Sequence, residues 1–106
     1  MNIQFKKGVL EICVLVLVSS EDRYGYELAV KISESFEVAV GSVYPLLNRL
    51  TMEGFFSTYL MESTRGPPRK YYRLTPEGWA YMRHLIDEWM SFTHAVNEII
   101  EEGLKP

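Results

Sequence analysis

Apolar residues recur at helical spacing in three segments of the first half of the chain. Residues 5–18 are almost wholly apolar after two lysines, which predicts a helix buried on most of its sides. Residues 24–36 and 39–54 each carry one apolar stripe opposite polar residues, as amphipathic helices do. The stripes consist of Leu28, Ala29, Ile32 and Phe36, and of Val43, Leu46, Leu47 and Leu50. Polar turn formers at 19–23 and a glycine at 54 separate the segments, so we expect three successive helices.

The pattern then changes to one that is typical of strands. Residues 55–63 and 69–75 are rich in aromatic and β-branched side chains, and the sequence STRGPP lies between them. Pro67 and Pro68 stiffen this connection and remove two N–H donors from an exposed edge. We therefore expect a β-hairpin with a rigid, positively charged tip.

The last segment has the most regular apolar pattern. Thr75 is a good N-cap, Pro76 fits the first helical position, and the helix is expected to reach about Glu102 and end at Gly103. Its apolar residues are three and four apart, as in a heptad seam. The seam consists of Trp79, Met82, Ile86, Trp89, Thr93, Val96 and Ile100, flanked by Leu85, Phe92 and Ile99. One small domain cannot cover so wide a surface, so we expect a homodimer in which Trp79, Met82, Ile86, Trp89, Val96 and Ile100 contact a second copy.

The predicted fold is mainly α with a small β-hairpin. Three helices, a hairpin and a long helix describe a winged helix-turn-helix at residues 1–75, followed by a C-terminal dimerisation helix at residues 76–106. A chain of 106 residues is one domain by length, so we expect the two parts to form one compact unit.

The distribution of charge matters more here than its sum. The net charge is −3, but residues 1–75 carry +1 and residues 76–106 carry −4. The cations of the first part lie at its start, at Arg49 and in the turn at 65–73. The acidity therefore belongs to the last helix and does not exclude a nucleic-acid partner.

Four motifs, in this order and spacing, resemble the PadR family of bacterial and archaeal transcriptional regulators. They are YGYEL at 24–28, GSVYPLLNRL at 41–50, EGF at 53–55 and GPPRKYYRLTPEG at 66–78. The resemblance implies a dimeric winged-helix repressor that binds a palindromic operator in double-stranded DNA. The single helix of the tail is similar to the family's smaller subgroup, some members of which bind flat aromatic compounds between subunits. Ala39, where a capping Ser is usual, and Leu60, where Trp is frequent, depart from the family pattern.

The third predicted helix carries polar side chains away from its apolar stripe. A hydroxyl, an amide and a guanidinium on one face can contact base edges in a major groove, although an ordinary solvated face has the same pattern. The resemblance favours DNA contact by this set, which is Ser42, Tyr44, Pro45, Asn48 and Arg49. Pro45 leaves the start of the helix open, because a start near Ala39 gives a tightened or bent first turn, whereas a cap at Ser42 places the proline harmlessly in that turn.

Cations surround the predicted hairpin tip. Arg65, Arg69 and Lys70 can contact phosphates or a minor groove, or can simply keep an exposed hairpin soluble. The fixed shape of the Pro-Pro turn favours contact of these cations with DNA. Lys6 and Lys7 are equally consistent with phosphate neighbours and with a solvated helix start.

Two residues are candidates for contact with a small aromatic effector. Trp89 near a two-fold axis would approach its symmetry mate, so that two indoles sandwich a flat ring; a large interface side chain is the alternative. Glu11 is a lone charge in an apolar helix. It can face water and pair with Lys7, or, as the resemblance implies, lie near the dimer cleft and meet a cationic ligand.

The sequence carries no sign of catalysis, metal binding or a cofactor. His84 and His94 lack a second ligand pair, and no phosphate loop or nucleophile arrangement is present. Cys13 lies among apolar residues and is expected to be a buried structural thiol. The longest apolar run, 9–18, is too short to cross a bilayer, so we expect a cytoplasmic protein without a membrane partner. A winged-helix protein–protein adaptor is the alternative function, but the cations at 49, 69 and 70 favour DNA.

Overall fold

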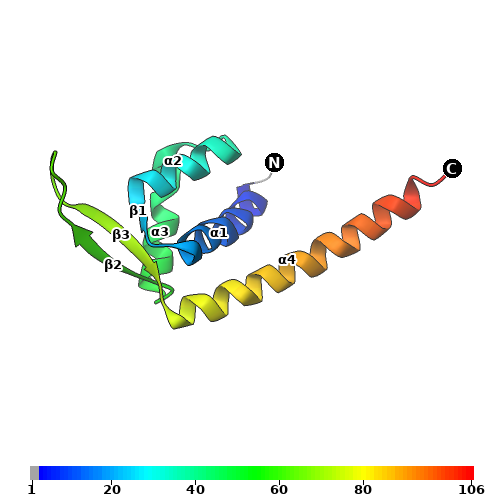
Figure 1. The fold of residues 1–106 in the computed structure, drawn as a ribbon. Coiled ribbons are helices and arrows are strands. Elements are labelled where there is room, and N and C mark those ends of the chain that lie inside the picture. Colours follow the sequence, from blue (N-terminus) through cyan, green and yellow to red (C-terminus); the bar gives the residue numbers. More distant parts are fainter. Residues whose placement is uncertain (1–2) are drawn as a thin grey trace.

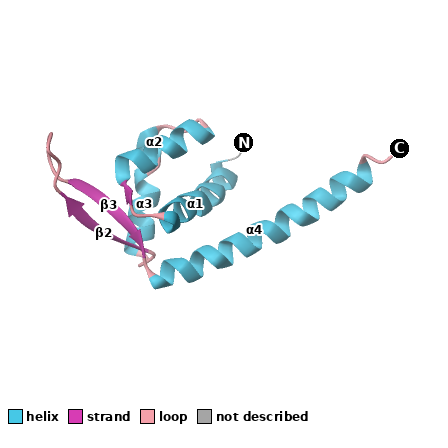
Figure 2. Cartoon of the chain, in the orientation of Figure 1, coloured by secondary structure: helices cyan, strands magenta, loops and turns pink. Residues whose placement is uncertain are grey.

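The computed structural model describes residues 3–106, with side chains described from residue 8 onward. Three helices, a hairpin and a long helix follow one another as predicted (Figures 1 and 2). The helices are α1 (Ile3–Ser20), α2 (Gly25–Phe36), α3 (Tyr44–Met52) and α4 (Pro76–Gly103), and the strands are β1 (Arg23–Tyr24), β2 (Phe56–Met61) and β3 (Arg69–Leu74). The fold class, mainly helical with a small antiparallel sheet, is therefore confirmed.

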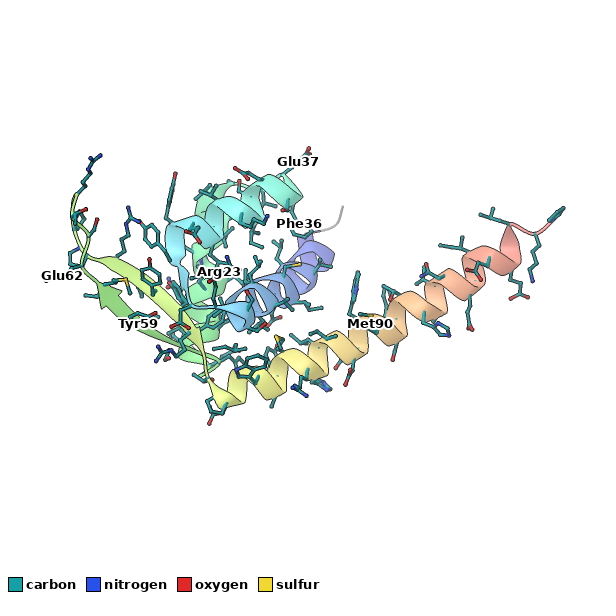
Figure 3. All side chains as sticks on the ribbon, viewed as in Figure 1. Arg23, Phe36, Glu37, Tyr59, Glu62 and Met90 are labelled. Carbon is teal, nitrogen blue, oxygen red and sulfur yellow. The ribbon has the colours of Figure 1, made fainter. Side chains whose placement is uncertain are left out.

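The sheet has one strand more than the sequence predicted. Its order is β1-β3-β2, and both pairings are antiparallel. Strand β1 begins at the last residue of the polar stretch 19–23, and its two residues are too few to show an alternating pattern. The side chain of Arg23, labelled in Figure 3, donates to the carbonyl of Leu17 at 3.0 Å and so attaches β1 to the end of α1.

The two faces of the sheet have different environments. Phe56, Tyr72 and Leu74 lie on the inner face and are buried in the core. Tyr24, Tyr71 and Tyr59 occupy paired positions across the three strands and so share the outer face. The outer face consequently carries a row of aromatic rings that the core does not cover.

The core lies between α1, α2, α3 and the inner face of the sheet. Its buried residues are Val14, Leu15, Val18, Leu28, Ala29, Ile32, Val43, Leu46, Leu47, Leu50, Phe56, Tyr72, Leu74 and Met82. Cys13 is only half-buried, and burial raises the pKa of its thiol. That shift lowers the reactivity of Cys13 and agrees with a structural role.

The start of α3 answers the question raised by Pro45. A short 3-10 turn, η1 (Val40–Ser42), precedes the α-helix, so Pro45 lies in the first turn of α3 and removes no bond of the helix interior. Ser42 does not cap α3, because its hydroxyl donates to the carbonyl of Ala39 at 2.6 Å. Neither predicted start is therefore right in full: the α-helix begins at Tyr44 with Val43 as its N-cap, and the tightened turn precedes it.

The base of α4 is attached closely to the end of α3. The hydroxyl of Thr75 accepts the N–H of Gly78 at 3.0 Å, which confirms the predicted cap, and also donates to the carbonyl of Gly54 at 2.7 Å. A side chain could not replace the hydrogen of Gly78, because a Cβ there would lie 2.2 Å from the carbonyl oxygen of Phe55. This close approach fixes where α4 begins relative to the helix-turn-helix unit.

Among the described residues, α4 contacts the rest of the chain from its start to about Phe92, which lines a groove together with α1 (Figure 1). Met82 is buried in the core of its own chain, so it departs from the predicted dimer contacts, and Leu85 and Ile86 pack beside it. Beyond Met90, labelled in Figure 3, the helix extends away from the other elements, and the whole chain measures 62 × 29 × 21 Å. The C-terminal part of α4 lies away from the other described elements (Figure 1).

Candidate nucleic-acid interface

The start of α3 presents polar groups to solvent. Ser42 and Pro45 are exposed, Asn48 is exposed one turn later on the same helix, and Tyr44 is half-buried. Tyr44 lies close to Tyr24, Tyr26 and Tyr72, and burial is the main cause that raises the pKa of its hydroxyl. The amide of Asn48 and the ring of Tyr44 are therefore the groups that α3 offers to a partner.

Arg49 departs from the set predicted for this face. Its guanidinium points towards α1 and contacts Glu11, with Nη2 lying 3.1 Å from Oε1. It also contacts Glu53 one turn later, at 3.2 Å. Arg49 is therefore paired with two carboxylates, and its side chain is only 33% exposed.

Glu11 departs from both interpretations that its sequence position allowed. It is 9% exposed, and besides Arg49 it accepts the hydroxyl of Tyr81 at 2.7 Å. Burial, followed by this hydrogen bond, raises the pKa of Tyr81 to about 12. Glu11 thus joins α1, α3 and α4 and does not face water; the side chain of Lys7, its expected partner, lies outside the described residues.

The cations of the wing, the hairpin loop and strands at residues 56–74, are exposed. Arg65 lies in the hairpin tip, which is seen above Glu62 in Figure 3. Its neighbour Gly66 has a φ of 130°, a backbone conformation that mainly glycine adopts. Lys70 lies over the ring of Tyr72, on the inner face, at 5.6 Å. Arg69 lies on the outer face, so the two neighbouring cations point to opposite sides of the hairpin.

The outer face of the sheet holds residues that sequence reasoning missed. The rings of Tyr59 and Tyr71 stack with centroids 5.6 Å apart, and Tyr24 follows at 6.0 Å from Tyr71. Arg73 lies over Tyr59, labelled in Figure 3, and is bound to Asp22. Alternation along RKYYR could have placed Arg69, Tyr71 and Arg73 on one face, but the pairing with β1 that brings Tyr24 beside them has no local signal.

A shallow apolar groove lies between α1 and α4. Its volume is about 350 Å³, and its lining residues are Gly8, Val9, Ile12, Leu85, Glu88, Trp89 and Phe92. The rings of Trp89 and Phe92 lie 6.3 Å apart along one side. Trp89 therefore lines an open apolar groove that a flat molecule could enter.

Three of the predicted dimer contacts of α4 are open to solvent, whereas Ile86 and Trp89 are half-buried. Trp79 and Ile100 are 41% and 49% exposed, and Val96 is also exposed. Phe92 and Ile99, from the predicted flanking row, are exposed as well. These positions form one stripe along the helix. The stripe leaves a large apolar surface unburied in the single chain.

This architecture matches a known family of regulators. The model of the transcriptional regulator PadR-like family matches residues 14–84, which include the helix-turn-helix, the wing and the start of α4. The chain belongs to the PadR-like family. Membership implies DNA-binding regulation of transcription, and PadR-like regulators are not enzymes.

Solved structures of transcriptional regulators have the same fold over nearly the whole chain. A PadR-like transcriptional regulator of Bacillus cereus is 38% identical with a TM-score of 0.81, over 92% of this chain and 96% of its own. A Streptococcus transcriptional regulator is 36% identical with a TM-score of 0.83, over 92% of this chain and 98% of its own. An uncharacterised protein of Lysinibacillus sphaericus is 36% identical, over 93% of this chain and 94% of its own.

None of the helices in residues 3–106 is both long and apolar enough to cross a membrane.

Proposed function

We propose that this PadR-like chain is a dimeric, sequence-specific DNA-binding repressor that a small flat aromatic ligand releases from a palindromic operator. One observation carries the proposal: exposed polar groups on the recognition helix α3 and an exposed cationic wing occur in a chain whose last helix is half uncovered. Residues 1–75 would bind DNA and residues 76–106 would dimerise, in the cytoplasm.

The DNA-binding surface consists of the start of α3 and the wing. The residues that would contact DNA are Ser42, Tyr44, Pro45 and Asn48, with Arg65, Arg69 and Lys70 on the wing. Asn48 would contact base edges in the major groove, and the wing cations would contact phosphates. Arg49 is left out because its guanidinium is bound to two carboxylates. Lys7 stays a candidate phosphate contact.

The dimer would form along the uncovered stripe of α4. Burial of apolar surface on association is favourable in proportion to the area removed from water. The part of α4 beyond residue 89 is about 21 Å long at 1.5 Å per residue, enough for three successive turns to pair with a second copy. Trp79, Trp89, Val96 and Ile100 would contribute most, and Ile86 would contribute its exposed edge.

The effector would bind in the groove beside Trp89. The apolar lining of Val9, Ile12 and Phe92 suits a planar hydrocarbon ring. Glu88, at the same groove, would favour a cationic or hydrogen-bond-donating substituent. Glu11 is left out because Arg49 already neutralises its carboxylate.

Selection of bound DNA from a random pool, at one stated salt concentration, tests this function. A repressor should enrich one palindromic sequence and bind it far more tightly than random DNA. Uniform, weak binding would reject sequence recognition. A complete lack of binding, combined with capture of a defined protein partner, would favour the adaptor function.

A further inference from the structure

Two arginines of β3 lie in matching positions on the outer face of the wing. Arg69 and Arg73 are two residues to either side of Tyr71, so all three side chains point to the same side. The guanidinium of Arg69 lies 4.9 Å from the ring centroid of Tyr24, and that of Arg73 lies 5.1 Å from the ring centroid of Tyr59. Each cation is thus placed over a tyrosine of a neighbouring strand.

The two arginines differ in what else they contact. Arg73 binds Asp22, whose Oδ2 lies 3.0 Å from Nη2 and 3.1 Å from Nε. Asp22 also accepts the hydroxyl of Tyr59 at 2.6 Å, so the charge of Arg73 is neutralised inside a closed set of contacts. Among the described residues, no carboxylate lies within 4.0 Å of the Arg69 guanidinium, whose cation–π contact is with Tyr24.

Tyr24 itself is held by the backbone. It pairs with Tyr71 in the sheet, and it is also the N-cap residue of α2. The ring is only half-buried, so it contributes little to the core. Tyr24 therefore connects the wing to the first helix of the helix-turn-helix.

We propose that Tyr24 is a positioning residue that holds the Arg69 guanidinium ready for a DNA phosphate, while Asp22 removes the matching Arg73 from the interface. Stacking occupies one face of the guanidinium and leaves its edge N–H groups available to phosphate oxygens. A side chain ordered in advance loses less freedom when DNA binds. The inference rests on the proposed DNA binding and adds to it a residue outside the recognition helix and the wing loop.

The test compares DNA affinity in two matched sets of variants. The first set is Tyr24→Leu, Tyr24→Phe, Arg69→Ala and the double variant Tyr24→Leu/Arg69→Ala. The second set, the control, is Tyr59→Leu and Arg73→Ala. Each protein is titrated with random-sequence duplex from 50 to 200 mM salt, the range over which phosphate contacts change affinity strongly. Thermal unfolding of each variant confirms that it is folded at the titration temperature.

Tyr24→Leu should weaken binding about two- to fivefold, the range expected for loss of an exposed cation–π contact. Tyr24→Phe should bind like the unchanged protein, because the ring is retained. The double variant should be no weaker than Arg69→Ala, and Arg69→Ala should lower the slope of log affinity against log salt by about 0.9. Both control variants should keep the affinity of the unchanged protein.

Several results would overturn the inference while leaving DNA binding itself intact. They are additive losses in the double variant, a Tyr24→Phe variant as weak as Tyr24→Leu, or a loss in Arg73→Ala equal to that in Arg69→Ala. Absence of salt-dependent binding by the unchanged protein would instead overturn the proposed function and this inference together.

Discussion

Glu11 of α1 and Arg49 of α3 form an ion pair whose Oε1 and Nη2 atoms lie 3.1 Å apart. Because Tyr81 of α4 donates to the same carboxylate oxygen, one acidic side chain holds three helices together. The pair connects the helix proposed to contact bases to the helix proposed to dimerise. Its loss should affect both stability and DNA binding, and only the second effect depends on the proposed function.

Glu11→Ala should lower the free energy of unfolding by about 1–3 kcal/mol, since it removes charged hydrogen bonds from a nearly buried site. Glu53→Ala is the matched control. Glu53 is the more exposed partner of the same guanidinium, so its loss should cost less than about 1 kcal/mol. Urea unfolding at one protein concentration measures both, because dimerisation would make stability depend on concentration. Equal losses of unfolding free energy in the two variants would show that the buried Glu11 contact stabilises the fold no more than the exposed Glu53 contact does.

The raised pKa of Tyr81 predicts a loss of stability in alkali. The folded value of about 12 lies above the ordinary value of 10.0, so the protonated phenol is favoured by folding. Its contribution is complete below pH 10 and is lost as the pH rises through 12. Tyr81→Phe keeps the stacking on Phe55, whose ring centroid lies 4.1 Å away, but cannot ionise. Between these pH values the unchanged protein should lose stability faster than Tyr81→Phe, and parallel curves would contradict the assignment.

Charges placed on the uncovered stripe of α4 should separate the proposed dimer. Val96→Glu/Ile100→Glu is the sharper test, because both side chains are exposed and lie beyond the core of their own chain. A charge in a buried apolar interface costs several kcal/mol. Sedimentation should find a monomer. His94→Glu, on the polar face opposite the stripe, should remain a dimer, and a dimeric double variant would reject the stripe as the interface.

Asn48 and Lys70 should affect DNA binding in different ways. Asn48→Ala should weaken binding to a selected operator by about 1–3 kcal/mol more than binding to random DNA, as loss of a base contact does. Lys70→Ala should weaken both by the same factor, as loss of a phosphate contact does. Titration of both DNAs at one salt concentration measures the difference. The reverse pattern would exchange the two roles.

Gly78→Ala should destabilise the chain severely. The added Cβ would lie 2.2 Å from the backbone oxygen of Phe55 and 2.6 Å from Leu74 Cδ1, and backbone cannot move as a flexible side chain can. A cost of about 1–3 kcal/mol or more is expected for such overpacking. Gly103→Ala, with open space around its Cα, is the control and should change the urea midpoint little. A stable Gly78→Ala protein would mean that the base of α4 can shift.

Local patterns predicted most of the fold but not the partners of its charged groups. The helical stripes, the hairpin and the cap at Thr75 depend on neighbours a few residues away, and these features were predicted correctly. Strand β1 and the Glu11–Arg49 pair depend on contacts between distant segments, for which one sequence holds no signal. Met82 belongs to the regular heptad pattern, yet it faces its own core. A heptad pattern shows that a face is covered but not which chain covers it.

The 28 residues of α4 make a rod about 42 Å long at 1.5 Å per residue. Because the backbone at Gly78 meets the backbone of Phe55 directly, the rod and the end of α3 share one stiff joint. A tilt of about 10° at that joint would displace the far end by about 7 Å at this length. Conversely, anything that holds the far end in place restricts the tilt of the joint to a few degrees. Movement at the far end of α4 can therefore change the direction of α3, the helix proposed to contact bases, from a point several nanometres away.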